Sequence, residues 1–238
     1  ASDDAGDGPT IGILGEYDAL PGLSQAVSAE REPIQAGGPG HGCGHNLFGT
    51  AGVGAAIAVS RALERGDADG EVRFYGCPAE ETLVGKTFMA RDGAFDDLDA
   101  AVTWHPSDHT APQRGSSLAL DSLSFTFEGE SAHAAASPES GRSALDAVQL
   151  LNTGVEYMRE HVPEEVRVHY NVQQGGDAPN VVPADASVWY FVRAPTREGV
   201  ERVTAWLREI AEGAATMSRT SVSERYYTGC HRLVSNSV

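Results

Sequence analysis

The hydrophobic and polar positions of the first half alternate between short strand-like runs and one long helical run. Thr10–Gly15 is an almost continuous apolar run, as expected of a strand that is covered on both faces. Val72–Gly76 and Ala100–Trp104 are similar, and Leu47–Glu64 between the first two strands has the length of a helix. This alternation of strand and helix predicts an α/β layer sheet.

The pattern changes from Asp121 onward, where strand-like alternation and amphipathic helices follow in a different order. The predicted strands are Ser122–Phe127, Val166–Gln173, Ala186–Val192 and Ser221–Tyr227, and the predicted helices are Ala144–His161 and Glu198–Met217. The resulting order βαββαβ is that of the ferredoxin-like split unit. We therefore expect a second, α+β domain.

The charge of the chain excludes some partners. There are 17 Lys and Arg residues against 34 Asp and Glu residues, so the formal net charge is −17. Such a surface repels phosphates and anionic lipid, so we expect neither a nucleic-acid nor a membrane partner. Lys86 is the only lysine. This composition is typical of halophilic proteins, and equally of an acidic cytosolic protein from a GC-rich genome.

The cysteines and the apolar stretches indicate the cellular compartment of the protein. Cys43, Cys77 and Cys230 are odd in number and have no framework spacing, which favours a reducing, cytoplasmic compartment. The longest apolar stretch, around Val53–Val59, is too short for a transmembrane helix. Residues 1–10 lack the cationic start and apolar middle of a signal peptide.

Chemically active residues follow each strand of the first half. Asp18 comes after the first strand, Glu80 and Glu81 after the second, and His105 after the third. In open α/β sheets ligands bind outside the carboxyl ends of the strands. Polar residues also begin ordinary loops, which explains any one of these positions more easily than all of them together.

A glycine-rich segment, His41-Gly42-Cys43-Gly44-His45, lies just before the long helix. Its permissive backbone lets Cys43 and His45 face one ion, and thiolate and imidazole are typical zinc ligands. A carboxylate and a second imidazole would complete the site. We therefore group Cys43, His45, Glu81 and His105 as candidate metal ligands.

The adjacent carboxylates of Glu80 and Glu81 suit different roles. Neighbouring residues of an extended loop point in opposite directions, so one side chain can bind metal while the other faces the substrate. A carboxylate beside an activated water is what general-base hydrolysis requires. An exposed acidic pair is the alternative in a chain with 34 acidic residues, but the position after a strand argues against it.

Five motifs occur in an order that resembles a known family. They are residues 15–22 (GEYDALPG), 41–46 (HGCGHN) and 78–81 (PAEE), the strand-end His105, and residues 129–141 (GESAHAAASPESG). Together they resemble the co-catalytic metallopeptidases and amidohydrolases, which include aminoacylase, glutamate carboxypeptidase and auxin-conjugate hydrolase. Within this family, the motifs of the chain are most similar to those of the aminobenzoyl-glutamate hydrolase type.

The resemblance implies roles for individual residues. Cys43, His45, Glu81 and His105 would bind two divalent metal ions, zinc or manganese, and Glu80 would be the catalytic base. Asp18 would orient a ligand without binding metal itself.

The resemblance also implies a second domain with a role in catalysis. It would be a ferredoxin-like lid through which the chain forms a homodimer. Its His133 would stabilise the oxyanion across the dimer, and its Asn180 would contact the substrate. Arg193, at the end of a strand, would suit a substrate carboxylate, but a surface ion pair explains it equally well.

The resemblance fixes the expected domain boundaries. Residues 1–118 would form part of a metallo-exopeptidase-like α/β catalytic domain, and residues 119–229 the inserted lid. Residues 230–238 would begin the return to the catalytic domain. In the family that return carries a further metal-binding histidine, and His231 does not stand in a matching context. We therefore expect the catalytic domain to be incomplete here.

Three functional hypotheses remain open from the sequence. The first is a metal-dependent amidohydrolase that cleaves an N-acyl amino acid or a small peptide-like amide. The second is a truncated, inactive relative that acts as a dimerising or ligand-binding module. The third, covalent catalysis by Cys43 paired with His45, is weaker, since it leaves Glu80 and Glu81 without a role.

Overall fold

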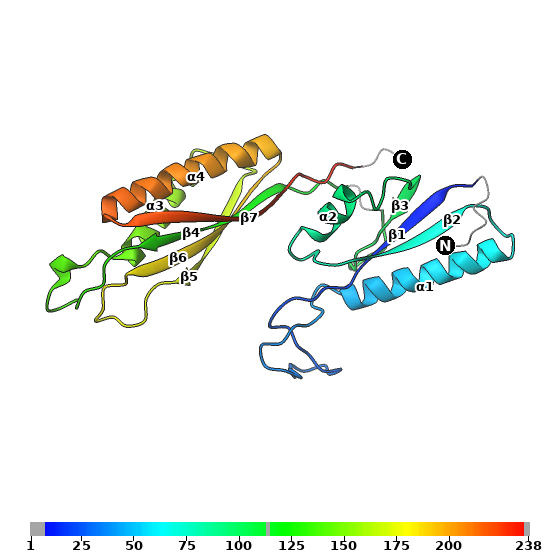
Figure 1. Cartoon of the computed structure of the whole chain (residues 1–238), viewed down its shortest axis with the longest axis horizontal. Coiled ribbons are helices and arrows are strands. Elements are labelled where there is room, and N and C mark those ends of the chain that lie inside the picture. Colours follow the sequence, from blue (N-terminus) through cyan, green and yellow to red (C-terminus); the bar gives the residue numbers. More distant parts are fainter. Residues whose placement is uncertain (1–7, 113–114, 236–238) are drawn as a thin grey trace. The chain divides into compact units, whose positions relative to one another are not determined.

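The computed structural model describes residues 8–112 and 115–235, and it divides the chain into two compact units. Unit 1 comprises residues 1–112 and unit 2 comprises residues 113–238 (Figure 1). Each unit has a sheet and helices of its own. The boundaries expected from the sequence, after residues 118 and 229, stay predictions.

Unit 1 is a three-stranded parallel sheet with helices between its strands. Its elements are β1 (Thr10–Glu16), α1 (His45–Glu64), β2 (Glu71–Cys77), α2 (Gly85–Arg91) and β3 (Ala100–Val102). The strand order is β2-β1-β3, and β1 pairs in parallel with both neighbours. This confirms the predicted α/β class. Strand β3 ends two residues earlier than predicted, and the short α2 was not predicted.

Helix α1 packs on the sheet through a narrow stripe of side chains. His45, Phe48 and Gly52 are buried, whereas Val53 and Ile57 are exposed. By length and composition alone, the 20 residues of this helix are apolar enough to cross a membrane. The whole helix thus reaches a length that the stretch at residues 53–59 does not, and the expectation of no membrane partner stays a prediction. In the structure the helix lies along the sheet (Figure 1).

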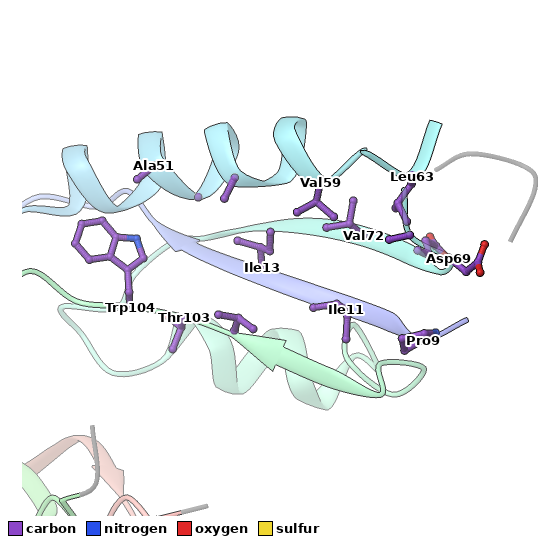
Figure 2. A pocket seen from close by; sticks show the side chains of 15 residues that line it. Pro9, Ile11, Ile13, Ala51, Val59, Leu63, Asp69, Val72, Thr103 and Trp104 are labelled. Carbon is purple, nitrogen blue, oxygen red and sulfur yellow. The ribbon is translucent and has the colours of Figure 1, made fainter. Parts of the chain in front are cut away.

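A groove of about 570 Å³ runs between α1 and the sheet. Figure 2 shows its apolar walls, with Val59 of α1 facing Ile13 of β1 and Val72 of β2. Trp104 closes one end and also stacks edge-on against Phe48, with ring centroids 5.5 Å apart. The interior of unit 1 is therefore only partly filled along this helix.

Unit 2 is a four-stranded antiparallel sheet with two helices on one face (Figure 1). Its elements are β4 (Ala119–Glu128), a 3-10 turn (Pro138–Ser140), α3 (Ala144–Arg159), β5 (Arg167–Gln174), β6 (Asp185–Ala194), α4 (Arg197–Ser218) and β7 (Ser221–Cys230). The strand order is β5-β6-β4-β7. The predicted order βαββαβ is therefore confirmed.

Both helices of unit 2 begin at residues that the sequence marks as caps. The Ser143 hydroxyl accepts a hydrogen bond from the Asp146 N–H, and the Thr196 hydroxyl accepts one from the Gly199 N–H. The inward faces of both helices pack on alternate residues of β4 and β6, such as Phe125 and Val188. The contiguous hydrophobic core of the described residues lies in this unit.

Candidate metal centre

The site begins at one edge of the sheet of unit 1, where the parallel strands all end. Strand β1 ends at Glu16, β2 at Cys77 and β3 at Val102. Because the strands are parallel, the loops that follow them leave from the same edge. This arrangement brings the segments with Asp18, Glu80 and His105 to one place, as predicted.

A left-handed glycine turns the chain into α1 and sets the positions of Cys43 and His45. Gly44 is the residue before the helix and has φ of +79°. A side chain there would be strained, and its Cβ would lie 2.8 Å from Cγ of Pro106 in the loop after β3. The close approach of these two loops brings Cys43 near His105.

His45 is fully buried, and one of its ring nitrogens is fixed by Asp18. Nδ1 lies 3.1 Å from both the backbone oxygen and Oδ1 of Asp18. Since a backbone carbonyl can only accept, Nδ1 carries the proton, and Nε2 presents its lone pair to the site. Asp18 therefore holds the ring of His45, and its predicted role in orienting a metal ligand stays a prediction.

His105, like His45, has its Nδ1 hydrogen-bonded to a backbone oxygen and its Nε2 directed into the site. Its Nδ1 donates to the backbone oxygen of Pro106 at 3.1 Å, and its Nε2 lies 3.2 Å from Sγ of Cys43. Potential ligand atoms of Cys43, His45 and His105 all lie within 4.8 Å of one another. Three of the four predicted metal ligands are thus brought together.

Glu80 and Glu81 lie in a strained turn after β2. Ala79 and Leu83 have φ of +56° and +60°, values that are unusual for residues with a side chain. The turn is tied to the site because the Glu81 N–H donates to Oδ2 of Asp18 at 2.9 Å. Asp18 therefore contacts two of the predicted ligand residues, His45 through its side chain and Glu81 through its backbone.

Burial and the negative charge of the site raise the pKa values of Cys43 and Glu80. The pKa of the Cys43 thiol is raised by burial and by the nearby carboxylates of Glu81 and Glu80. The pKa of Glu80 is raised by burial and by Glu16. A nucleophilic cysteine needs the opposite, an electropositive setting that stabilises the thiolate. The pairing of Cys43 with His45 as a nucleophile and base therefore gains no support from these surroundings.

The donor set fits a divalent cation. Among the described residues, three buried side-chain atoms have no hydrogen-bond partner: Oε2 of Glu16, Nε2 of His45 and Oε1 of Glu81. Unpaired buried polar atoms are costly, and all three are electron-pair donors that a cation would satisfy. Thiolate, imidazole and carboxylate together are a donor set that suits zinc.

Two residues of this site were not predicted. Oε2 of Glu16 lies 3.1 Å from Nε2 of His45, and the amine of Lys86 contacts the other oxygen of Glu16. The atoms of Glu16, His45 and Glu80 form a second potential ligand group, so His45 belongs to both groups. The signal was visible, because Glu16 stands directly at the end of a strand and Lys86 is the only lysine.

In unit 2, the loops with His133 and Asn180 contact each other. The N–H groups of Ala135 and Ala136 both donate to Nδ1 of His133, at 3.2 Å each. Nε2 of His133 is therefore the protonated nitrogen and can donate a hydrogen bond. The backbone oxygen of Asn180 accepts from the Ala134 N–H at 2.9 Å, which joins the two loops.

Arg193 lies apart from these loops, on β6. Its guanidinium stacks on the ring of Phe191, 5.0 Å from the centroid. The structure therefore leaves its assignment to the substrate as a prediction.

Comparison with known proteins agrees with this fold and these motifs. Residues 119–216 match the peptidase dimerisation domain M20_dimer, which covers most of unit 2. The metal-ligand motifs lie in unit 1, and the relatives described next match nearly the whole chain. The chain therefore belongs to the co-catalytic metallopeptidase and amidohydrolase family that its motifs resemble.

The particular relatives are hydrolases of amide bonds. The chain is 50% identical over 230 residues to one of the subunits of p-aminobenzoyl-glutamate hydrolase of Escherichia coli, covering 96% of this chain and 48% of that protein. It is 33% identical over 214 residues to the Xaa-Arg dipeptidase of Mus musculus, covering 89% and 46%. The chain thus spans about half the length of these relatives.

Solved structures show the same fold. An aminobenzoyl-glutamate utilization protein of Klebsiella pneumoniae matches with a TM-score of 0.66 at 22% identity, over 97% of this chain and 53% of that one. A dinuclear metal-binding peptidase of the M20 family from Bacillus subtilis matches with a TM-score of 0.64 at 22% identity, over 97% and 60%. Both likenesses are to the fold alone.

Proposed function

We propose that the chain carries the metal-binding part of a metal-dependent amidohydrolase. The observation that carries this proposal is that potential ligand atoms of Cys43, His45 and His105 lie within 4.8 Å of one another, as do those of Glu16, His45 and Glu80. Buried donor atoms of His45, Glu16 and Glu81 also have no hydrogen-bond partner. These residues would hold two divalent ions, zinc or manganese, at the carboxyl edge of the sheet. When bound, such ions lower the pKa of water and polarise a carbonyl group.

Glu80 is the general base of the proposed reaction. Its Oε2 lies 3.8 Å from Nε2 of His45, so the carboxylate faces the ligand group while part of its side chain reaches solvent. It takes a proton from the attacking water and passes it to the leaving nitrogen of the amide. The raised pKa of Glu80, caused by burial and by Glu16, suits a group that must both accept and donate a proton.

Unit 2 supplies the oxyanion contact and the dimer. His133 has its Nε2–H free to donate, since its Nδ1 accepts from two backbone amides. In a homodimer that forms through unit 2, His133 of the partner subunit would stabilise the oxyanion of the tetrahedral intermediate. Asn180 and Arg193 would bind the substrate.

The proposed substrate is an N-acyl amino acid or a small peptide-like amide, and the proposed location is the cytoplasm. The names of the relatives supply two specific probes, p-aminobenzoyl-glutamate and a dipeptide with C-terminal arginine. Cleavage of one probe and not the other would identify the acyl group and the amino acid of the substrate.

The test is hydrolysis of these two probes by the zinc- or manganese-loaded chain and by its Glu80→Gln variant. Loss of the base should lower kcat by about 10²- to 10⁴-fold, while the bound metal is retained. Glu71→Gln, which removes a carboxylate that pairs with Arg73, is the matched control and should keep full activity. Equal turnover by Glu80→Gln and the unchanged chain would refute the role of Glu80.

A second candidate is a non-catalytic dimerising module, which the well-packed core of unit 2 favours. Metal analysis and the same hydrolysis assay separate the two. A stable dimer that binds no metal and cleaves neither probe would support the module. Metal-dependent cleavage supports the enzyme.

A further inference from the structure

Glu16 is the most deeply buried carboxylate of the metal centre. It is 7% exposed and lies at the end of β1, next to the buried His45. Its two oxygens have different surroundings. Oε1 contacts the amine of Lys86, while Oε2 has no hydrogen-bond partner and lies 3.1 Å from Nε2 of His45.

The contact between Glu16 and His45 lacks hydrogen-bond geometry. Nε2 of His45 is likewise without a hydrogen-bond partner, although it lies so close to a carboxylate oxygen. Its lone pair faces Oε2, because the ring proton is on Nδ1 and is donated to Asp18. Two lone pairs that face each other in a buried place repel, and a cation that both atoms contact would remove the repulsion.

Lys86 determines how Glu16 can act. Its amine holds Oε1 of Glu16 from the first turn of α2. With Oε1 held by Lys86, Oε2 is the oxygen that faces His45 and has no hydrogen-bond partner. Glu80, the proposed base, lies beside Glu16 and His45, with its Oε2 3.8 Å from Nε2 of His45.

We propose that Glu16 is an additional metal ligand, which binds through Oε2 beside His45, and that Lys86 is the positioning residue that fixes its orientation. This inference rests on the proposed function, because it needs a cation in the site. It extends the ligand set beyond Cys43, His45, Glu81 and His105 to the end of the central strand.

The test measures Zn²⁺ affinity by competition with a chromophoric chelator, without reference to activity. Four forms of the 238-residue chain are compared: unchanged, Glu16→Gln, Glu16→Gln with Lys86→Met, and Glu71→Gln. Glu71 is a matched control, because it is a mostly buried carboxylate of the same sheet that pairs with a cation, Arg73. Far-UV circular dichroism checks that each variant is folded.

The double variant distinguishes between Glu16 as a metal ligand and Glu16 as the counter-ion of Lys86. If Glu16 is a ligand, Glu16→Gln weakens Zn²⁺ binding at least about tenfold, and the double variant stays weak, because the oxygen ligand is absent from both. If Glu16 only balances the charge of Lys86, removing both charges restores the affinity, and the proposal is wrong. The double variant also leaves no unpaired charge, so it reports on binding even if Glu16→Gln alone unfolds.

The remaining outcomes are also decisive. An affinity of Glu16→Gln equal to that of the unchanged chain would overturn the assignment of Glu16 and leave the proposed function intact. An unchanged chain that binds no Zn²⁺ would overturn the metal centre itself, and with it the role of Glu16. A similar loss of affinity in Glu71→Gln would show that the effect is not specific to the site.

Discussion

At the scale of single residues, Asp18 connects two parts of the metal centre. Its side chain accepts from Nδ1 of His45 and from the N–H of Glu81, so it fixes both an imidazole and the turn that carries two carboxylates. Groups that orient ligands in this way typically contribute about 10- to 100-fold to metal affinity. Asp18 would thus affect a bound metal ion through its ligands, without contacting it.

We therefore predict that Asp18→Ala lowers Zn²⁺ affinity by about 10- to 100-fold while the chain stays folded. The reason is that His45 loses the acceptor that fixes its tautomer. Competition with a chromophoric chelator measures the affinity. Asp67→Ala, which removes an exposed carboxylate that pairs with Arg65, should leave it unchanged. Equal affinities for Asp18→Ala and the unchanged chain would contradict this role.

Asp121 is the corresponding buried carboxylate of unit 2. It is 2% exposed and accepts hydrogen bonds from Arg197 at 2.6 Å, from Tyr226 at 2.6 Å and from Thr204 at 2.9 Å. Burial and this carboxylate together raise the pKa of Tyr226 to about 12. The group therefore links β4, α4 and β7 through one charge.

We predict that Asp121→Asn lowers the free energy of unfolding by about 3 kcal/mol, because it leaves Arg197 without its buried partner. The pKa of Tyr226 should fall toward its ordinary value of about 10. Urea unfolding and spectrophotometric titration of tyrosine measure the two effects. Glu224→Gln, the partner of the more exposed Arg208, should cost less than about 1 kcal/mol.

At the scale of elements, helix α1 places the metal centre by its close approach to β1. A Cβ added at Gly49 would lie 2.8 Å from the backbone oxygen of Glu16, so only glycine lets the helix come this near. Gly54 of the same helix has open space around it. The distance between His45 and Glu16 therefore depends on one glycine position.

We predict opposite effects for alanine at these two positions. Gly54→Ala should raise the free energy of unfolding by up to about 1 kcal/mol, because alanine favours a helix at an exposed position. Gly49→Ala should lower it and weaken Zn²⁺ binding, because the helix moves away from Glu16. Thermal unfolding with and without Zn²⁺ measures both. Identical behaviour of the two variants would contradict the role given to Gly49.

The sequence was sufficient to predict most elements but not the whole site. Asp18, Glu80, Glu81 and His105 could be predicted because each follows a strand. A parallel sheet brings the ends of its strands to one edge, even when the conformations of the loops are unknown. The sequence does contain a signal for Glu16, at a strand end, and for Lys86, the only lysine. Their pairing is found only in the structure, since it joins residues 70 apart through a short helix that no apolar pattern predicts.

At the scale of the whole molecule, the two units differ in how their cores are packed. Among the described residues of unit 1 the buried apolar side chains are Phe48 and Cys77, whereas the hydrophobic cluster of unit 2 extends over both of its helices and the sheet. Hydrophobic burial is the main source of stability. The two units therefore have unequal local stability.

We predict that the backbone amides of β4 and β6 exchange with deuterium much more slowly than those of β1 and β2. Hydrogen exchange followed by mass spectrometry measures the protection of each strand. Added Zn²⁺ should slow exchange in β1 and the start of α1, because it binds only folded unit 1. Equal protection of both sheets without metal would contradict the difference in packing.

The central claim is that the edge of the sheet in unit 1 is a metal centre whose two ligand groups share His45. The most direct measurement is the number of divalent ions per chain after equilibrium dialysis against Zn²⁺, read by plasma mass spectrometry. We predict about two ions for the unchanged chain and loss of both in His45→Ala, because each ligand group loses a member. An unchanged chain without bound Zn²⁺, or a His45→Ala variant that binds as much as the unchanged chain, would contradict it.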